Sequence, residues 1–294
     1  MSVLSRREFL GQSAAVVGAL AAAGPLAAAP ARKINSPTDQ VVLGKTGVKT
    51  SLIGLGTGSV GVKRSSNQVK LGQEKFTRLV RHAYDRGITY FDTADQYGSH
   101  IFLREALRGI PREKLYLQTK TRATSAAVAR ADLDRFREEL GTDYIDTLLM
   151  HCMTKGGWPT DFRPVMDMLS EAKAKGWVRA VGVSCHGLAP LQTAVKSDWV
   201  EIDLARINPV GGNKGRMDGT PQEVAACLRS MHDQGKGVIG MKILAEGTLK
   251  KPEEQLQSLQ FVLGLGCVDA FVIGFESPEQ IDQILKLTEV ALKR

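Results

Sequence analysis

Four residues with acid–base side chains stand at or just beyond the ends of three successive apolar segments: Asp92, Tyr97, Lys120 and His151. A phenol has an ordinary pKa of about 10, and a nearby ammonium group stabilises the phenolate and lowers that pKa. A lysine buried in this role needs a carboxylate beside it, and Asp92 supplies one. We therefore expect a relay in which Asp92 and Lys120 make Tyr97 a proton donor.

His151 completes this set, because an imidazole can hydrogen-bond a substrate oxygen and orient it. The set includes no activated nucleophile and no metal cluster. An acid aimed at an oxygen suits protonation of a carbonyl while its carbon is attacked, most simply by a hydride from a nicotinamide cofactor. Taken singly, Lys120 and His151 are better explained as an ordinary strand-end lysine and a semi-buried histidine. Their combination at successive strand ends favours a site.

The elements that would position these residues alternate regularly from residue 51 onward. Strands are expected at residues 51–58, 88–91, 114–120, 145–151, 178–184, 202–207, 237–241 and 270–273. Helical patterns follow at residues 73–86, 101–108, 126–140, 165–175, 189–195, 223–234, 252–263 and 278–292. Eight β-then-α repeats predict an α/β fold of the (β/α)8 TIM barrel type, with a doubly wound open sheet as the alternative. In such a barrel, catalytic residues lie at the carboxyl ends of strands, where these four are found.

The first 31 residues have the pattern of an export signal. Arg6 and Arg7 precede an uncharged, Ala-rich run from residue 14 to about residue 29. The paired arginines resemble a twin-arginine (Tat) signal, a route that exports folded proteins. The run is short, rich in small residues and broken by Pro25, so it predicts a cleaved signal peptide rather than a membrane anchor.

The rest of the chain divides into a short connection and one domain. Residues 32–40 are polar and are expected to form a linker. Residues 41–43 and 48–50 flank a Gly-rich turn and predict a short β-hairpin. We therefore expect residues 41–294 to form a single barrel domain, located in the periplasm, with the Tat machinery as a partner and no stable membrane anchor after cleavage.

Composition excludes several other classes of protein. The 294 residues carry a formal charge of +8, but lysine and arginine are scattered among acidic residues. The charge indicates solvated faces and an anionic small ligand rather than nucleic acid, for which no motif is present. The four cysteines form no CxxC pair, so neither a zinc site nor a redox motif nor a disulfide framework is indicated.

Several motifs together resemble the aldo/keto reductase family: Phe91-Asp92-Thr93-Ala94, Tyr97-Gly98, Thr119-Lys120-Thr121, Leu148-Leu149-Met150-His151 and Gly182-Val183-Ser184. The similarity runs from about Val41 to Ile284. It implies a TIM barrel, a nicotinamide cofactor extended across the barrel mouth, and reduction of an aldehyde or ketone. By this match Tyr97 donates the proton, Asp92 and Lys120 tune it, and His151 orients the carbonyl.

The resemblance also implies the cofactor contacts. They are expected at Gly56, Thr57, Gly58, Asp92, Ser184, Cys185, Met241, Lys242, Leu244, Gly274, Phe275, Glu276, Ser277 and Gln280. Three of the family's usual residues are replaced. Cys185 stands where an asparagine amide is usual, Leu204 where a glutamine is usual, and Met241 where an aromatic ring stacks. Lys242 is either a phosphate ligand or a rim lysine.

Two further departures concern the choice between NADP and NAD. Relatives often carry a basic residue before the serine that corresponds to Ser277, and an arginine shortly after it, to bind the 2′-phosphate of NADP. This chain has Glu276 and Gln280. An acid there repels a phosphate and can accept a hydrogen bond from a ribose hydroxyl, so we expect a preference that leans to NAD. The altered cofactor positions leave one alternative of a different class, an exported barrel that acts as a binding or sensing module.

Overall fold

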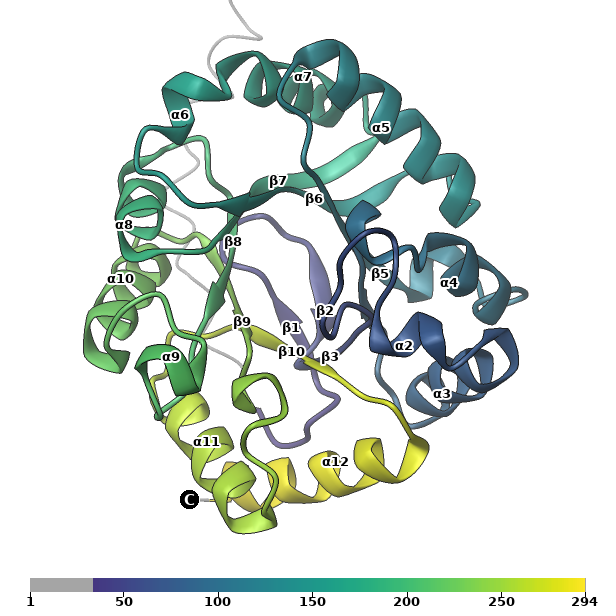
Figure 1. Ribbon diagram of the computed structural model, residues 1–294, viewed down its shortest axis with the longest axis vertical. Coiled ribbons are helices and arrows are strands. Elements are labelled where there is room, and N and C mark those ends of the chain that lie inside the picture. The colour runs from purple at the N-terminus through teal and green to yellow at the C-terminus, as the bar shows by residue number, and fades with distance from the viewer. Residues whose placement is uncertain (1–33, 294) are drawn as a thin grey trace, which may run out of the picture. The chain divides into compact units, whose positions relative to one another are not determined.

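Eight parallel strands close into a barrel in the computed structural model of this chain, which describes residues 34–293 (Figure 1). The strands are β3 (Ile53–Gly56), β4 (Tyr90–Asp92), β5 (Tyr116–Thr121), β6 (Ile145–Met153), β7 (Val178–Cys185), β8 (Ile202–Arg206), β9 (Gly237–Met241) and β10 (Ala270–Gly274). They follow chain order around the barrel, and β10 pairs with β3 to close it. The predicted TIM barrel is thus confirmed, and closure excludes the open sheet.

A ring of helices surrounds the strands (Figure 1). Its long members are α3 (Gln73–Asp85), α4 (His100–Ala106), α5 (Ala126–Leu140), α7 (Arg163–Ala174), α8 (Leu188–Lys196), α10 (Pro221–Asp233), α11 (Pro252–Gly264) and α12 (Pro278–Leu292). Short turns not expected from the sequence are α2 (Asn67–Lys70), α6 (Trp158–Asp161), α9 (Gly212–Gly215), η1 (Asp95–Tyr97), η2 (Arg112–Lys114) and η3 (Ala245–Gly247). None of the helices within residues 34–293 is long and apolar enough to cross a membrane.

Local signals in the sequence explain where the helices begin and end. α5 starts after Ser125, whose hydroxyl accepts a hydrogen bond from the Val128 amide, and it ends at Gly141 in the left-handed conformation. α10 starts with a capping box in which Thr220 and Glu223 satisfy each other's backbone amides. Such caps fix the lengths of the helices and hence where each following strand enters the barrel.

The predicted hairpin is present and closes one end of the barrel. β1 (Gln40–Val42) pairs antiparallel with β2 (Lys49–Ser51). Leu43 and Val48, between these two strands, are buried in the same cluster as the side chains inside the barrel. The hairpin begins at the last residue of the segment expected to be a linker, and Asp39 in that segment accepts hydrogen bonds from the amides of Asn35 and Ser36. Residues 1–31, the expected Tat signal, lie outside the described residues.

Alternation along the strands produces layers inside the barrel. The lower layer is mainly apolar and includes Tyr90, Tyr116 and Leu149. The next inward positions along β4, β5 and β6 toward the carboxyl ends are Asp92, Gln118 and Lys120, and His151. Side chains of the lower layer therefore fill the barrel interior, and the inward side chains at the carboxyl ends of the strands make its mouth polar.

Candidate active site

Three of the four expected catalytic residues, Asp92, Lys120 and His151, lie near the carboxyl ends of the adjacent strands β4, β5 and β6. Asp92 ends β4, and Lys120 lies one residue before the end of β5, so that its Nζ hydrogen-bonds Asp92 Oδ1 at 2.6 Å. The Lys120 side chain is only 1% exposed. It also donates to the Thr93 carbonyl at 2.8 Å, and Gln118 donates to Asp92 Oδ1 at 2.7 Å. The buried charges are therefore paired and hydrogen-bonded.

Tyr97 lies at the end of η1, directly above this pair. Lys120 Nζ is 4.9 Å from the centroid of the Tyr97 ring, and the His151 ring is 5.7 Å from it, edge to face. Two glycines make room for the phenol, because a Cβ at Gly58 would lie 2.2 Å from Tyr97 Cε2 and one at Gly61 would lie 2.3 Å from Cδ1. Gly58, expected as a cofactor contact, thus forms the wall that the ring leans on.

The expected lowering of the Tyr97 pKa is wrong. Burial, and then the Asp92 carboxylate, raise the pKa of Tyr97 well above its ordinary value. Lys120 does not offset this, because Asp92 and the Thr93 carbonyl engage its ammonium group, and no group of residues 34–293 hydrogen-bonds the Tyr97 hydroxyl. Burial lowers the pKa of Lys120, while Asp92 acts against that shift. Tyr97 is therefore a protonated phenol at neutral pH, with its hydroxyl available to a ligand.

His151 sits in a β-bulge near the end of β6. The register between β6 and β7 shifts between Met150 and Met153, and Cys152 has a φ of 64°. A left-handed conformation at a non-glycine residue costs on the order of 1–3 kcal/mol and persists only where surrounding structure enforces it. Here the Cys152 amide donates to Ser184 Oγ at 3.0 Å. Alternation from the inward Leu149 directs His151 toward the mouth, and no signal in the sequence marked the bulge that follows.

His151 is neutral in this environment. Burial, and then the positive charge of Lys120, lower its pKa well below the ordinary value. Its Nδ1 is buried without a hydrogen-bond partner among residues 34–293, so Nε2 is the nitrogen that can meet a ligand. The orphaned nitrogen marks a place where the protein does not satisfy its own polar group.

An ionic network holds the turn that carries Tyr97. Asp95 pairs with Arg64 at 2.8 Å and with Arg135 at 2.7 Å. Glu139 on α5 accepts from both arginines and from His100 Nδ1 at 2.7 Å, which together hold its pKa at about 2. η1 is therefore tied to α5, and the position of the phenol depends on the helix layer as well as on β4.

Backbone strain concentrates at the same end of the barrel. Among residues 34–293, eight non-glycine residues have positive φ: Val60, Lys63, Arg64, Cys152, Arg216, Lys242, Ala245 and Glu246. All lie in or after the ends of β3, β6, β8 and β9. Residues with strained backbone conformations cluster at active sites and ligand sites in proteins, so their position here supports a functional site at this end of the barrel.

The residues expected to hold the nicotinamide end divide into those that reach the mouth and those that do not. Ser184 Oγ accepts from the Cys152 amide, so its own hydrogen is free to be donated to a ligand oxygen. Met241, half buried, ends β9 beside the inner cluster. Thr57 is fully buried and donates to the Asp92 carbonyl at 2.9 Å, which positions β4. The Cys185 thiol is fully buried in the layer between strands and helices, so it faces away from the mouth, contrary to expectation.

The expected contacts for the outer end of the cofactor lie on β10 and its surroundings. Gly56 and Gly274 pair across β3 and β10 at the rim, and the Val272 and Ser59 side chains occupy the space that a Cβ at each would need. Ser277 precedes α12, and its side chain makes no capping hydrogen bond. The Phe275 ring is buried in the outer core and Leu244 packs against that core, so neither side chain opens onto this edge.

The charged and amide side chains here are already engaged. Glu276 is exposed and accepts from Asn67 Nδ2 at 2.8 Å. Gln280 Oε1 accepts from the Glu276 amide at 2.8 Å. Lys242 Nζ pairs with Glu246 at 2.7 Å. The donor hydroxyl of Ser184 and the amino-terminal end of α12, where the Ser277 side chain makes no capping bond, fit a dinucleotide, and this fit does not depend on Cys185.

Comparison with known proteins agrees with this geometry. The profile of the Aldo/keto reductase family matches residues 52–262. The chain belongs to the aldo/keto reductase family. This is an oxidoreductase family whose members in general use NADP(H) or NAD(H).

The similar proteins include curated and solved members of that family. The chain is 33% identical over 134 residues to an aldo-keto reductase of Mycolicibacterium smegmatis, covering 43% of this chain and 45% of the relative. It is 26% identical over 168 residues to the NADH-specific methylglyoxal reductase of Escherichia coli, covering 49% and 51%. The chain thus spans about half the length of these curated relatives. An aldo-keto reductase structure from Bacillus halodurans superposes with a TM-score of 0.69 at 19% identity, covering 87% of this chain and 95% of that one, which shows the shared fold.

One buried acid of this aldo/keto reductase explains where the Cys185 thiol points. Asp203 on β8 is fully buried, and no N–H or hydroxyl group of residues 34–293 bonds either of its oxygens. Burial raises its pKa to about 7, and the Cys185 thiol, a weak donor, acts against that shift. The folded protein therefore binds a proton that the unfolded chain has released, between about pH 4 and pH 7.

We expect Asp203→Asn to change how stability depends on pH. The wild-type protein should lose stability as pH rises from about 4 to about 7, whereas the variant should not, giving an advantage of up to about 4 kcal/mol at pH 8 and none near pH 4. Unfolding midpoints at both pH values measure this. Asp198→Asn, at an exposed carboxylate, is the matched control. Parallel pH curves for wild type and Asp203→Asn would contradict the assignment.

Sequence reasoning missed a cluster of polar residues on the opposite side of the mouth. Arg206 ends β8 and contacts His186 Nδ1 and Asp218 Oδ1. The His186 ring is 6.3 Å from that of His151. Period-2 alternation could have found Arg206, because it follows the inward Leu204 by two residues. His186 and Asp218 lie in loops and carry no such signal.

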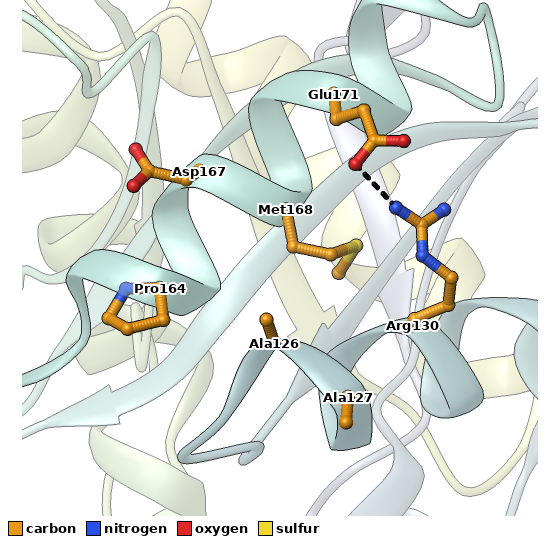
Figure 2. Close-up of a pocket in the computed structure, with 7 residues that line it drawn as sticks. All are labelled: Ala126, Ala127, Arg130, Pro164, Asp167, Met168 and Glu171. Carbon is orange, nitrogen blue, oxygen red and sulfur yellow. Dashed lines mark hydrogen bonds and ion pairs between the residues drawn. The ribbon is translucent and has the colours of Figure 1, made fainter.

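An open depression between α5 and α7 lies on the outer side of the barrel (Figure 2). Ala126, Ala127 and Met168 line it, and an Arg130–Glu171 ion pair of 2.7 Å crosses one side. It holds none of the catalytic side chains, and nothing in the structure indicates an occupant. We assign no site to it.

Proposed function

We propose that this chain reduces an aldehyde or ketone, or runs the reverse oxidation, by hydride transfer from NAD(P)H with Tyr97 as the proton donor. The observation that carries the proposal is a protonated Tyr97 held above the buried Lys120–Asp92 pair, with neutral His151 beside it. Membership of the aldo/keto reductase family supports the reaction class.

The residues divide the work at the carbonyl oxygen. Nε2 of His151 and the Tyr97 hydroxyl both address that oxygen, so they fix the carbonyl in one orientation. A nicotinamide cofactor, when bound, supplies the hydride to the carbonyl carbon. Negative charge then develops on the oxygen, and Tyr97 neutralises it by giving up its proton. The phenolate left behind would lie near the Lys120 ammonium group, which is 4.9 Å from the ring centroid and shares its positive charge with Asp92.

Ser184 and the barrel rim perform the binding. The free hydroxyl hydrogen of Ser184 can meet the amide oxygen of the nicotinamide, and the apolar Leu204 offers that amide no polar partner. The amino-terminal end of α12, which follows β10, would take the phosphate-bearing half.

Turnover of a broad carbonyl substrate tests the proposal. The purified chain is expected to oxidise NADH or NADPH in the presence of 4-nitrobenzaldehyde, followed by the loss of nucleotide absorbance. Binding of the nucleotide without turnover of any aldehyde or ketone would instead support the alternative function, a binding or sensing module.

The cofactor preference is expected to lean to NAD. Glu276 places an exposed carboxylate before α12, where it would repel a 2′-phosphate, and the similar methylglyoxal reductase of Escherichia coli is NADH-specific. We expect tighter binding of NADH than of NADPH, and Glu276→Arg should shift the ratio of the two dissociation constants toward NADPH by about tenfold. Glu289→Arg makes the same charge change at an exposed site at the far end of α12 and serves as the control. Tighter NADPH binding by the wild type would overturn the assignment.

We also propose that the chain is exported to the periplasm by the Tat pathway. The support is the Arg6-Arg7 pair and the Ala-rich run that follows it. Because the route exports folded proteins, the cofactor would be loaded before export and remain bound. Periplasmic protein that lacks nucleotide absorbance and binds NAD(P) only at millimolar concentration would contradict a retained cofactor.

A further inference from the structure

A mostly buried arginine faces the barrel mouth on the side away from β3 and β10. Arg206 is the last residue of β8. The alternate residues before it on the same strand, Ile202 and Leu204, lie in the inner cluster. The Arg206 side chain is 19% exposed. Alternation along the strand therefore directs this guanidinium into the mouth rather than to the helices.

The partners of Arg206 leave it incompletely satisfied. Nη1 donates to Asp218 Oδ1 at 3.2 Å, and Nη2 donates to His186 Nδ1. Nε is buried with no partner among residues 34–293, and so is Asp218 Oδ2. A buried ion pair stabilises a fold only when its remaining polar atoms are also bonded, so this pair is poorly explained as a structural one.

His186 does not neutralise the arginine. A guanidinium group only donates, so His186 Nδ1 accepts and the ring is neutral, with its proton on Nε2. Burial, and then Arg206 itself, lower the pKa of His186 to about 3. Burial raises the pKa of Asp218 to about 6, so this carboxylate is largely ionised at pH 7 and is the counter-charge of Arg206, which it contacts through Oδ1 alone.

Other cations near this point have their own partners. Lys242, Lys120 and Arg122 all act on His186 electrostatically; Glu246 and Asp92 pair with the two lysines, and the exposed Arg122 donates to Gln96 Oε1 at 2.8 Å. Arg206 Nε is buried and cannot reach a ligand, so the capacity of Arg206 to bind one lies in the second N–H group of Nη1 and of Nη2. A planar guanidinium group with this capacity matches a carboxylate.

We propose that Arg206, positioned by His186 and Asp218, binds a carboxylate group of the substrate, so that the compound reduced at Tyr97 is an oxo-acid anion. The inference rests on the proposed carbonyl reduction and names its substrate class. The spacing is suitable, because the His186 ring that Arg206 contacts is 6.3 Å from the His151 ring. A short carbon chain or one aromatic ring would join a carbonyl at His151 to a carboxylate at Arg206.

The cofactor diphosphate is a second oxyanion that an arginine at this mouth could bind. The amino-terminal end of α12, which fits the phosphate-bearing half, follows β10 rather than β8. We therefore assign Arg206 to the substrate. If Arg206 binds a substrate carboxylate, its substitution should change the preference among substrates. If Arg206 binds the cofactor diphosphate, its substitution should weaken the affinity for the nucleotide.

The test compares two aldehydes that differ in one charge, 4-carboxybenzaldehyde and methyl 4-formylbenzoate. The wild type should prefer the acid in kcat/KM. Arg206→Met should lower kcat/KM for the acid by about 10- to 100-fold, leave the ester within about threefold, and leave the dissociation constants of NADH and NADPH unchanged. Arg163→Met, at an exposed arginine paired with Asp167, is the control and should change none of these values.

Equal losses for both aldehydes together with weaker nucleotide binding would assign Arg206 to the diphosphate and overturn the proposal. A wild type that does not prefer the acid would also overturn it. If Arg206→Met fails to fold, Arg206→Lys keeps the charge but loses the planar pair of donors, and it should still lower the preference for the acid.

Binding measured without turnover separates this inference from the proposed function. Calorimetric titration with 4-(hydroxymethyl)benzoate, and with its methyl ester as the uncharged counterpart, asks only whether Arg206 holds the carboxylate. Binding of the acid that is lost in Arg206→Met would support the carboxylate site even if no aldehyde were reduced. Equal binding of the acid and the ester would rule out the carboxylate site at Arg206 even if the enzyme reduced aldehydes.

Discussion

Tyr97→Phe is expected to lower kcat for carbonyl reduction by about 10²- to 10⁴-fold, because it removes the group that gives its proton to the carbonyl oxygen. The phenylalanine ring would still pack against Gly58 and Gly61 and would make no new contact. The lost hydroxyl bonds no group of residues 34–293, so the unfolding midpoint and the dissociation constant of the nucleotide should not change. Steady-state kinetics, thermal unfolding and nucleotide titration measure the three quantities.

Tyr84→Phe provides the matched control, because it removes a phenol hydroxyl from α3 in the outer helix layer. It should leave kcat unchanged. If Tyr97→Phe retained full activity, the proton donor would have to be another group, and the proposed reaction would lose its central residue.

The second large effect is expected from Lys120→Met, which should abolish turnover and also destabilise the fold. Removing the ammonium group leaves the buried Asp92 carboxylate with Gln118 as a donor but without its counter-charge. Breaking a buried pair in this way costs about 3–5 kcal/mol. Chemical unfolding and kinetics with a broad aldehyde measure the two losses separately.

A double substitution separates the two roles of Lys120. Lys120→Met with Asp92→Asn removes both buried charges, so most of the lost stability should return while turnover stays absent. Arg163→Met at the exposed pair with Asp167 should alter neither property. If the double variant were as unstable as the single one, the cost would come from packing around the lysine rather than from the orphaned carboxylate.

The sequence contained enough information for the fold because the barrel depends on local, repeated patterns. Eight apolar strands followed by amphipathic helices predict the closed parallel sheet, and caps such as Ser125 and Gly141 set the helix ends. The boundaries were less accurate. The strand expected at residues 88–91 lies at Tyr90–Asp92, because the pairing of Asp92 with Gly56 and Gln118, a non-local contact, decides where it ends.

The catalytic set was also predictable, since strand ends in a barrel converge whatever their separation in sequence. Asp92, Lys120 and His151 follow from that rule together with the chemistry of their side chains. The sequence did not predict the direction of the Tyr97 pKa shift. That direction depends on burial and on whether Lys120 donates its hydrogen bonds to the phenol or to Asp92 and Thr93. The choice between these partners depends on small differences in the position of the lysine Nζ atom.

The sequence by itself therefore determined the barrel, its mouth and the types of acid and base placed there, because side-chain period and strand order are properties of the chain. Only the tertiary structure showed that the Cys185 thiol turns toward Asp203 and away from the mouth, and that Arg206 joins His186 and Asp218 across two loops. These outcomes depend on which face of a strand is buried and on contacts between distant loops. Neither is encoded in the spacing of residues along one segment.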